Sequence, residues 1–330
     1  MSICLRRREF IAGLGGAAAS WPLAAGAQQR VPVVGFLNSG SRDEFAHLVG
    51  AFNQGLNEAG FLDGQNVKIE YHWAEGRYER LPDLAADLVR RRVTVIAATG
   101  GTSSVLAAKA ATETIRIPIV FIGGGDPVYQ GLVESLSRPG ANVTGMTVFS
   151  VDLGAKRLEL LRDLVPTAKI IGMLVNPTGQ TAEPDVVQAT ADKLGQQVRM
   201  LKVSTDRELA AAFATASGER VGGLLVGGDP FFNSRRDQIV GLTARHAIPT
   251  VFPWREYVIA GGLLSYGTSL GNTYCQAAGY VARILKGAKP SDLPAQRPSK
   301  FEVVLNLRAA KTLGLTIPPL ILLRADEVIE

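Results

Sequence analysis

Residues 93–122, VTVIAATGGTSSVLAAKAATETIRIPIVFI, decide the fold class of this chain. Two short apolar runs rich in β-branched residues, 93–98 and 117–122, predict strands. Between them, residues 102–112 have a helical period and follow a turn that contains Gly100 and Gly101. A strand, a helix and a strand in this order predict a parallel pair of strands with the helix packed on one face of the sheet.

The same alternation extends over the rest of the chain in two halves. In the first half we expect strands at residues 31–37, 67–72, 93–98 and 117–122, separated by helices at 44–59, 81–91 and 102–112. In the second half we expect a helix at 158–164, strands at 170–175, 197–203, 222–226 and 250–252, and helices at 185–194, 208–216 and 235–246. The chain then continues with a strand at 262–266, a helix at 269–285, a proline-rich connector at 288–298, a strand at 301–305 and a helix at 307–313. This order predicts an α/β protein with two doubly wound, mostly parallel sheets.

The N-terminus has the composition of an export signal. Three arginines at 6–8 precede a stretch rich in glycine and alanine at 10–23, and Ala25-Gly26-Ala27 matches a small-residue cleavage site. We therefore expect cleavage after Ala27 and a periplasmic location. Arg7 and Arg8 also have the spacing of a twin-arginine signal, and an ordinary secretory signal with an additional arginine is the alternative.

Composition and charge exclude several classes of protein. Hydrophobic residues make up 46% of the chain and charged residues 20%, which is typical of a globular protein and not of a disordered one. Removal of residues 1–27 leaves 32 basic and 29 acidic residues, a formal charge of +3, which gives little support to nucleic-acid binding. It also leaves Cys275 as the single cysteine, so no internal disulfide can form, and we expect a buried, unreactive thiol in a helix.

Motifs for covalent or metal chemistry are missing from the chain. It contains no H-E-x-x-H, C-x-x-C, Walker A or G-x-S-x-G sequence. His47, His72 and His246 lie in three distant segments, and none has a partner at metal-ligand spacing. We therefore expect no cofactor, no metal and no enzymatic activity. A periplasmic enzyme assembled from distant residues is the alternative.

The turn after residue 98 is one candidate for ligand binding. In open parallel sheets, ligands bind beyond the carboxyl ends of the strands, where backbone N–H groups and helix N-termini point. Gly100 and Gly101 allow close approach, and Thr102 and Ser103 add hydroxyls, so the turn suits a carboxylate or another small anion. The alternative is that these hydroxyls only cap the following helix and bind no ligand.

Two further candidates are the sequences Gly-Gly-Asp-Pro at 124–127 and 227–230, which both follow predicted strands. Asp126 and Asp229 could each accept a hydrogen bond from a ligand amine or hydroxyl. An Asp-Pro pair after a strand also starts ordinary turns.

Trp254 is the candidate for contact with an apolar part of a ligand. It follows Pro253 directly after the strand predicted at 250–252, so its ring forms either a cleft wall or part of the core. The neighbouring Arg255 could pair with a ligand carboxylate, or simply with Glu256.

Several ordered motifs resemble those of ABC transporter substrate-binding proteins of the tryptophan/tyrosine-binding type. The resemblance covers essentially the whole chain after the export signal. It is carried by the sequences DPV at 126–128, GLVESL at 131–136, RPGANVTG at 138–145, GGLLSYG at 261–267, ILKGAKP at 284–290 and NLRAAKTLGL at 306–315.

The resemblance implies a type I periplasmic binding-protein fold with two lobes and three chain crossings, which we place near Thr147, Gly261 and Ser291. The first lobe would comprise residues 28–147 and 262–290, and the second 148–261 and 291–330. A small ligand, aromatic or carboxylate-bearing and similar to an amino acid, would be clamped between the lobes by hinge closure. A monomer would then be recognised by an ABC permease. A sensor of the same fold that serves a signalling receptor is the alternative.

The resemblance and the strand-end positions together give one set of expected ligand-binding residues. These are Asn38, Ser39, Gly101, Thr102, Ser103, Gly125, Asp126, Asn176, Gly228, Asp229, Trp254 and Glu256.

Overall fold

A computed structural model describes residues 31–148, 151–179, 181–298 and 300–330. The export signal expected at residues 1–27 lies outside the described residues. Residues from Pro32 to Glu330 form one compact unit that contains two sheets. No helix formed by the described residues is both long and apolar enough to cross a membrane.

The first sheet has five parallel strands in the order β2-β1-β3-β4-β5. They are β1 (Val33–Asn38), β2 (Lys68–Trp73), β3 (Val95–Thr99), β4 (Ile119–Gly123) and β5 (Val143–Thr147). Its helices are α2 (Ala46–Glu58), α3 (Leu81–Arg90) and α4 (Thr102–Ala111). The strand order reverses between β1 and β3, and ligands bind at such a reversal in open α/β sheets.

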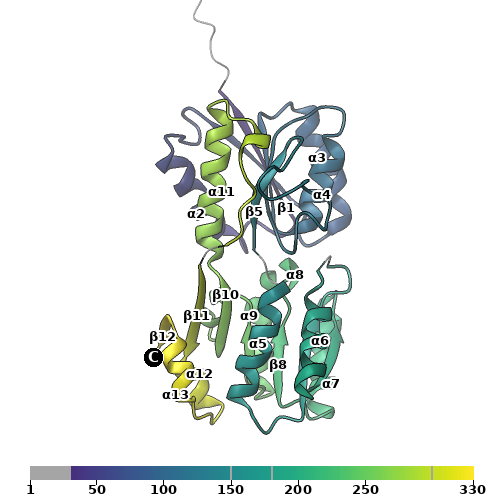
Figure 1. Cartoon of the computed structure of the whole chain (residues 1–330), viewed down its shortest axis with the longest axis vertical. Coiled ribbons are helices and arrows are strands. Elements are labelled where there is room, and N and C mark those ends of the chain that lie inside the picture. Colours follow the sequence, from purple (N-terminus) through teal and green to yellow (C-terminus); the bar gives the residue numbers. More distant parts are fainter. Residues whose placement is uncertain (1–30, 149–150, 180, 299) are drawn as a thin grey trace, which may run out of the picture. The chain divides into compact units, whose positions relative to one another are not determined.

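Alternate residues of the central strands pack on opposite faces of this sheet. Phe36 of β1 and Val95 of β3 contact the core cluster under α2, whereas Leu37 and Ile96 contact the cluster under α3 and α4. Figure 1 shows the long helix α11 (Leu270–Leu285) beside α2, on the opposite side of the sheet from α3 and α4. Strands buried on both faces explain the continuous apolar runs in the sequence.

The second sheet has seven strands in the order β12-β11-β10-β9-β8-β6-β7. The strands are β6 (Ile170–Val175), β7 (Gln197–Lys202), β8 (Gly223–Val226), β9 (Thr250–Phe252), β10 (Leu264–Thr268), β11 (Phe301–Asn306) and β12 (Glu327–Ile329). The β10–β11 pair is antiparallel and the other pairs are parallel. The order reverses again between β6 and β8, which gives this sheet its own switch point.

The helices of the second sheet lie on both of its faces. Helices α5 (Val151–Leu164), α6 (Glu183–Leu194), α12 (Leu307–Thr312) and α13 (Pro319–Arg324) contribute to one core cluster, and α7 (Asp206–Gly218), α9 (Arg236–Arg245) and α10 (Arg255–Ile259) to the other. The short helix α8 (Pro230–Ser234) follows β8. The expected α/β class with two mostly parallel sheets is therefore confirmed.

One strand lies in a different sheet from the one that the sequence division predicted. The segment 262–290 was expected in the first lobe, but β10 pairs with β9 and β11 in the second sheet. Only α11 crosses to the first sheet, where an added Cβ at Gly55 of α2 would lie 2.3 Å from the Cys275 carbonyl oxygen of α11. The chain therefore crosses after β10, near Ser269, and not near Gly261.

The last crossing also lies later than the expected position near Ser291. The backbone N–H of Gln296 donates to the Gly145 carbonyl oxygen at 2.9 Å, and that of Thr147 donates to the Gln296 carbonyl oxygen at 2.9 Å. The proline-rich connector thus runs along the edge strand β5, because that edge offers unpaired backbone groups. The chain returns to the second sheet only after Gln296.

The single cysteine outside the export signal is partly buried and lies at the contact between α11 and α2. The Cys275 Sγ atom is 3.9 Å from a carboxylate oxygen of Glu58. Burial and this carboxylate both raise the pKa of the Cys275 thiol, which keeps it protonated and unreactive.

Candidate functional site

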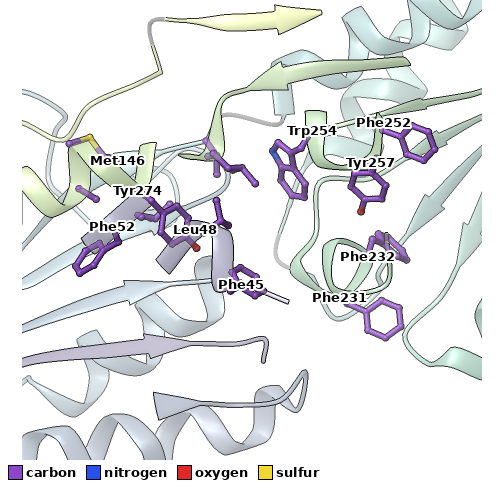
Figure 2. Packing of buried hydrophobic residues seen from close by; sticks show 14 of the residues in the cluster. Phe45, Leu48, Phe52, Met146, Phe231, Phe232, Phe252, Trp254, Tyr257 and Tyr274 are labelled. Atoms are coloured by element: carbon purple, nitrogen blue, oxygen red, sulfur yellow. The ribbon is translucent and has the colours of Figure 1, made fainter. Parts of the chain in front are cut away.

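The carboxyl ends of strands from both sheets open into one pocket of about 750 Å³, its mouth included. Figure 2 shows Trp254 on one side and Phe45, Leu48 and Tyr274 on the other. The side of the first sheet contributes Phe45, Leu48, Tyr78, Gly100, Gly101, Thr102, Ser103, Ile122, Gly124 and Val148. The side of the second sheet contributes Gly179, Thr181, Gly228, Asp229, Pro230, Asn233 and Trp254, and α11 adds Leu270 and Tyr274.

Asp229 is the only residue with a charged side chain among the described residues that line this pocket. It precedes α8, and its Oδ1 accepts hydrogen bonds from the Phe231 backbone N–H at 2.8 Å and the Asn176 Nδ2 at 2.9 Å. The Tyr78 hydroxyl, from the side of the first sheet, donates to the same oxygen at 3.3 Å. Burial raises the pKa of the Asp229 carboxyl, although these hydrogen bonds oppose the shift.

The second oxygen of Asp229 has no hydrogen-bond donor within the described part of the chain. Gly179 lies beside it, and a Cβ added at Gly179 would be 2.6 Å from the Oδ2 atom. Glycine at this position therefore lets the backbone lie close against this carboxylate oxygen. A cationic group of a ligand could complete the hydrogen bonding of Asp229.

The N-terminus of α4 lines the side of the first sheet. Gly100 and Gly101 have φ angles of +74° and +105°, which glycine adopts without strain. The N-cap residue Gly101 has no side chain to accept from the first backbone N–H groups of the helix. These donors and the positive end of the helix dipole suit a carboxylate.

Helix α4 also supplies two hydroxyls to the pocket wall. The Thr102 hydroxyl donates to the Gly124 carbonyl oxygen at 3.0 Å, so it is already used within the protein. The Ser103 hydroxyl has no hydrogen bond to any residue in the described ranges. Ser103 is thus the hydroxyl of α4 that is open to a ligand.

Trp254 forms an apolar wall of the pocket. Its side chain is 7% exposed and follows β9 directly, where it precedes α10. Phe45 and Leu48 contribute further apolar surface from the opposite side. Flat apolar walls with one carboxylate and one helix N-terminus can bind a ligand that has an apolar body, an amine and an acid group.

A model of ABC transporter substrate-binding proteins matches residues 30–329 of the chain. The chain belongs to this family. The resemblance stated from the sequence motifs is therefore confirmed. Proteins of this family bind small molecules and are not enzymes, which agrees with the expected lack of catalytic activity.

Two known proteins are similar to the chain over most of its length. The tyrosine-binding protein of Clostridioides difficile is 28% identical over 267 residues, which cover 80% of this chain and 75% of that protein. A crystal structure of an ABC domain from Streptococcus pneumoniae in complex with L-Trp has 26% identity and a TM-score of 0.81, and the match covers 90% of this chain and 99% of that chain.

A more distant likeness confirms the fold type. A leucine-binding protein from Thermotoga maritima is 16% identical and has a TM-score of 0.53, with 80% of this chain and 78% of that chain covered. The substrate-binding chain therefore has the type I periplasmic binding-protein fold that its sequence predicted.

Six of the expected site residues of this substrate-binding protein line the pocket, namely Gly101, Thr102, Ser103, Gly228, Asp229 and Trp254. Three others support lining residues from behind. Asn38 and Ser39 are fully buried under the Gly100 loop, where the Ser39 hydroxyl donates to the Gly100 carbonyl oxygen and the Asn38 Oδ1 accepts from the Gly40 backbone N–H at 2.7 Å. Asn176 holds the Asp229 carboxylate.

The other three expected residues lie outside the pocket. The Asp126 Oδ1 accepts from the Val128 backbone N–H at 2.8 Å, and its Oδ2 pairs with Arg297 at 3.8 Å. Gly125, with φ +82°, packs against Gln130. The Glu256 carboxylate lies 3.8 Å from the His47 Nε2 atom.

Some pocket residues were missed at the level of sequence. Tyr78, Asn233 and Tyr274 lie in or near helices and not directly after a strand, so the rule that selected strand ends did not select them. For Tyr274 the signal was its position one turn after Leu270 in the helix that follows β10. Asn233 could have been selected because it lies four residues, about one helical turn, after Asp229.

A buried ion pair stands behind the loop of Asp229. The Arg157 guanidinium of α5 pairs with the Glu183 carboxylate of α6, and both side chains are 1% exposed. The Glu183 Oε2 also accepts from the Gly228 backbone N–H at 2.8 Å, and the Arg157 Nη1 donates to the Tyr266 carbonyl oxygen of β10 at 3.1 Å. The pair therefore connects α5, α6 and β10 to Gly228, the residue that precedes Asp229.

Proposed function

We propose that this chain is the solute-binding component of an ABC importer and binds an amino-acid-like ligand with an aromatic or other apolar side chain. It works in the periplasm after export by its N-terminal signal. The family and the ligands named for its relatives, tyrosine and L-Trp, support the proposal. No bond of the ligand is made or broken in this function.

The observation that carries the proposal is the pairing of Asp229 with the N-terminus of α4 in one pocket. Asp229 is the one formal charge among the described lining residues, and its Oδ2 accepts no hydrogen bond from them. The ligand's ammonium binds this carboxylate, and its carboxylate binds the backbone N–H groups after Gly101 and the Ser103 hydroxyl. A zwitterion satisfies both ends, whereas an inorganic anion or a simple diamine satisfies only one.

The side chain of the ligand packs among the apolar walls. Phe45, Leu48, Trp254 and Tyr274 supply rings and aliphatic surface on both sides of the pocket (Figure 2). Aromatic pairs in offset or edge-to-face contact contribute about 0.5–1.5 kcal/mol beyond the burial of their area. An aromatic ligand side chain therefore gains more here than an aliphatic one of similar area.

Hinge closure follows from the composition of the pocket. The ligand's partners come from both sheets, so all of its contacts form together only when the two lobes approach. A ligand that binds the closed form more tightly shifts the population toward that form. The Tyr78 hydroxyl on Asp229 is a contact of this kind, since it joins the two sides. The ABC permease would then recognise the closed form.

Calorimetric titration of the purified protein with tryptophan, tyrosine, phenylalanine, leucine, glutamate and putrescine tests the ligand class. We expect binding of the aromatic amino acids, weaker binding of leucine, and none of glutamate or putrescine. Small-angle scattering with and without ligand tests closure, and a decrease in the radius of gyration is expected. Binding of putrescine alone, or an unchanged radius with saturating ligand, would contradict the proposal.

A further inference from the structure

Asn233 is a buried polar residue of the pocket whose amide oxygen has no partner among the residues that the structure describes. Its side chain is 2% exposed, and no described residue donates a hydrogen bond to its Oδ1. It lies on α8, where its backbone N–H donates to the Asp229 carbonyl oxygen at 3.0 Å. The amide therefore lines the pocket one helical turn beyond the charged end of the site.

Three other polar side chains of the pocket already have partners within the protein. The Tyr78 hydroxyl donates to Asp229, the Thr102 hydroxyl donates to Gly124, and the Thr181 hydroxyl accepts from the Glu183 backbone N–H at 3.2 Å. A buried amide oxygen without a donor is unfavourable, so such groups in proteins nearly always have a partner. The occupant of the pocket is the natural source of a partner for Asn233.

The surroundings of Asn233 indicate which part of the occupant it meets. Its neighbours on α8, Phe231 and Phe232, are buried in the core and are not among the described lining residues, so the rings of the pocket come from other elements. Trp254 and Phe45 line the same pocket. A lone amide among aromatic walls is suited to recognise a polar atom on an otherwise apolar ring, while Asp229 and α4 recognise the amine and the acid group.

We propose that Asn233 determines ligand specificity by hydrogen bonding to a polar atom on the ring of the ligand. This proposal rests on the proposed function, since it assigns the ring end of the same site. The amide can present its oxygen to an indole N–H or either of its ends to a phenol hydroxyl, because rotation of the side chain exchanges the two ends. The site then favours tryptophan or tyrosine over phenylalanine, which leaves the buried amide without a partner.

Titration of the unaltered protein with tryptophan, tyrosine and phenylalanine is the first test. We expect at least one of the two polar-ring amino acids to bind about tenfold or more tightly than phenylalanine. Equal affinities for all three would overturn the assignment of Asn233 but leave the proposed function intact. If none of the three binds, the proposed function itself fails.

The substitution Asn233→Leu is the second test, because leucine has nearly the size of asparagine and no polar atom. We expect it to reduce the preference for the polar ring about tenfold, with phenylalanine binding unchanged or tighter. An equal loss for all three ligands would show that Asn233 acts on the amine, the acid group or the fold, and would overturn the proposal.

Asn306→Leu is the matched control, since Asn306 is a buried asparagine that caps α12 and lies outside this pocket. It should lower the melting temperature without changing the preference among the three ligands. Asn233→Ala, which also removes the polar atoms, gives the same comparison if the leucine variant does not fold.

Discussion

The sequence Gly-Gly-Asp-Pro occurs twice, after β4 and after β8, and its two copies have different roles. The Asp229 side chain is buried in the pocket, whereas the Asp126 side chain is 42% exposed and pairs with Arg297. In both copies the Oδ1 atom accepts from the backbone N–H two residues later at 2.8 Å. The hydrogen bond from the aspartate to its own turn is therefore the same, and the tertiary surroundings decide which carboxylate can meet a ligand.

Two supports distinguish the second copy from the first. Asn176 and Tyr78 bind the Asp229 carboxylate, and the Arg157–Glu183 pair holds the preceding Gly228. Asp126 accepts from the backbone of its own turn and pairs with the exposed Arg297. A short motif thus becomes a binding group only where distant elements hold it.

The largest effect is expected from Arg157→Met, which removes the support behind the second copy. The Glu183 carboxylate would remain buried and uncompensated, and we expect a loss of about 3–5 kcal/mol in the free energy of unfolding. Urea denaturation measures this loss. Lys156→Met, which breaks the exposed pair between Lys156 and Glu159, should cost less than about 1 kcal/mol. Similar losses for both variants would mean that the buried pair has no special role.

Asp229→Asn should have the next largest effect, because it removes the charge and keeps the shape. We expect the affinity for an aromatic amino acid to fall by at least about 30-fold, which corresponds to about 2 kcal/mol. Calorimetry measures the affinity. The same change in the first copy, Asp126→Asn, should leave the affinity within about twofold. Comparable losses in both variants would refute the distinction between the two copies.

The affinity should also depend on pH through Asp229. Burial raises the pKa of this carboxyl in the free protein, and a bound ammonium group would lower it again. Binding therefore releases a proton when the pH is below the pKa of the free protein. As the pH decreases through that pKa, the affinity should fall by up to tenfold per pH unit. Because the pKa is raised, this fall should begin at a higher pH than for an ordinary aspartate, whose pKa is near 4.

Titrations between pH 4 and 8 test this pH dependence, with Asp229→Asn as the variant that should have a flat profile. A flat profile in the unaltered protein would mean that the ligand's amine does not meet Asp229.

The smallest effect is expected from Gly125→Ala in the first copy. Gly125 has φ +82°, and the added Cβ would lie 2.7 Å from the Gln130 Nε2 atom, the end of a flexible side chain. We expect a loss of about 1 kcal/mol in stability from the backbone conformation alone, with unchanged ligand affinity. Thermal unfolding and calorimetry measure the two quantities. A clear loss of affinity would show that the first copy also takes part in binding.

The fold was predictable from the sequence because strands buried on both faces appear as short, continuous apolar runs. The helices between them show a clear helical period. Strand β5 was missed because its sequence, VTGMT, is short and interrupted by Gly145. Helices α8 and α10 were missed because each has only five residues, which is too few to show a helical period. The membership of β10 was mispredicted because pairing between strands is a long-range property that no local pattern records.

The site was predictable only in part for a related physical reason. Strand ends are visible in the sequence, so Asp229 and the α4 turn could be named. The same rule could not tell Asp229 from Asp126, whose local sequences are identical. Asn233 and Tyr274 enter the pocket from helices, and only the packing of those helices selects which of their residues face it.

The first turn of α11 has a consequence for variation in this protein. Leu270 lies directly after the crossing that follows β10, and it lines the pocket together with Tyr274. The chain crossing and one wall of the pocket therefore share the same few residues of α11. Substitutions there should alter the rate of opening whenever they alter retention of the solute.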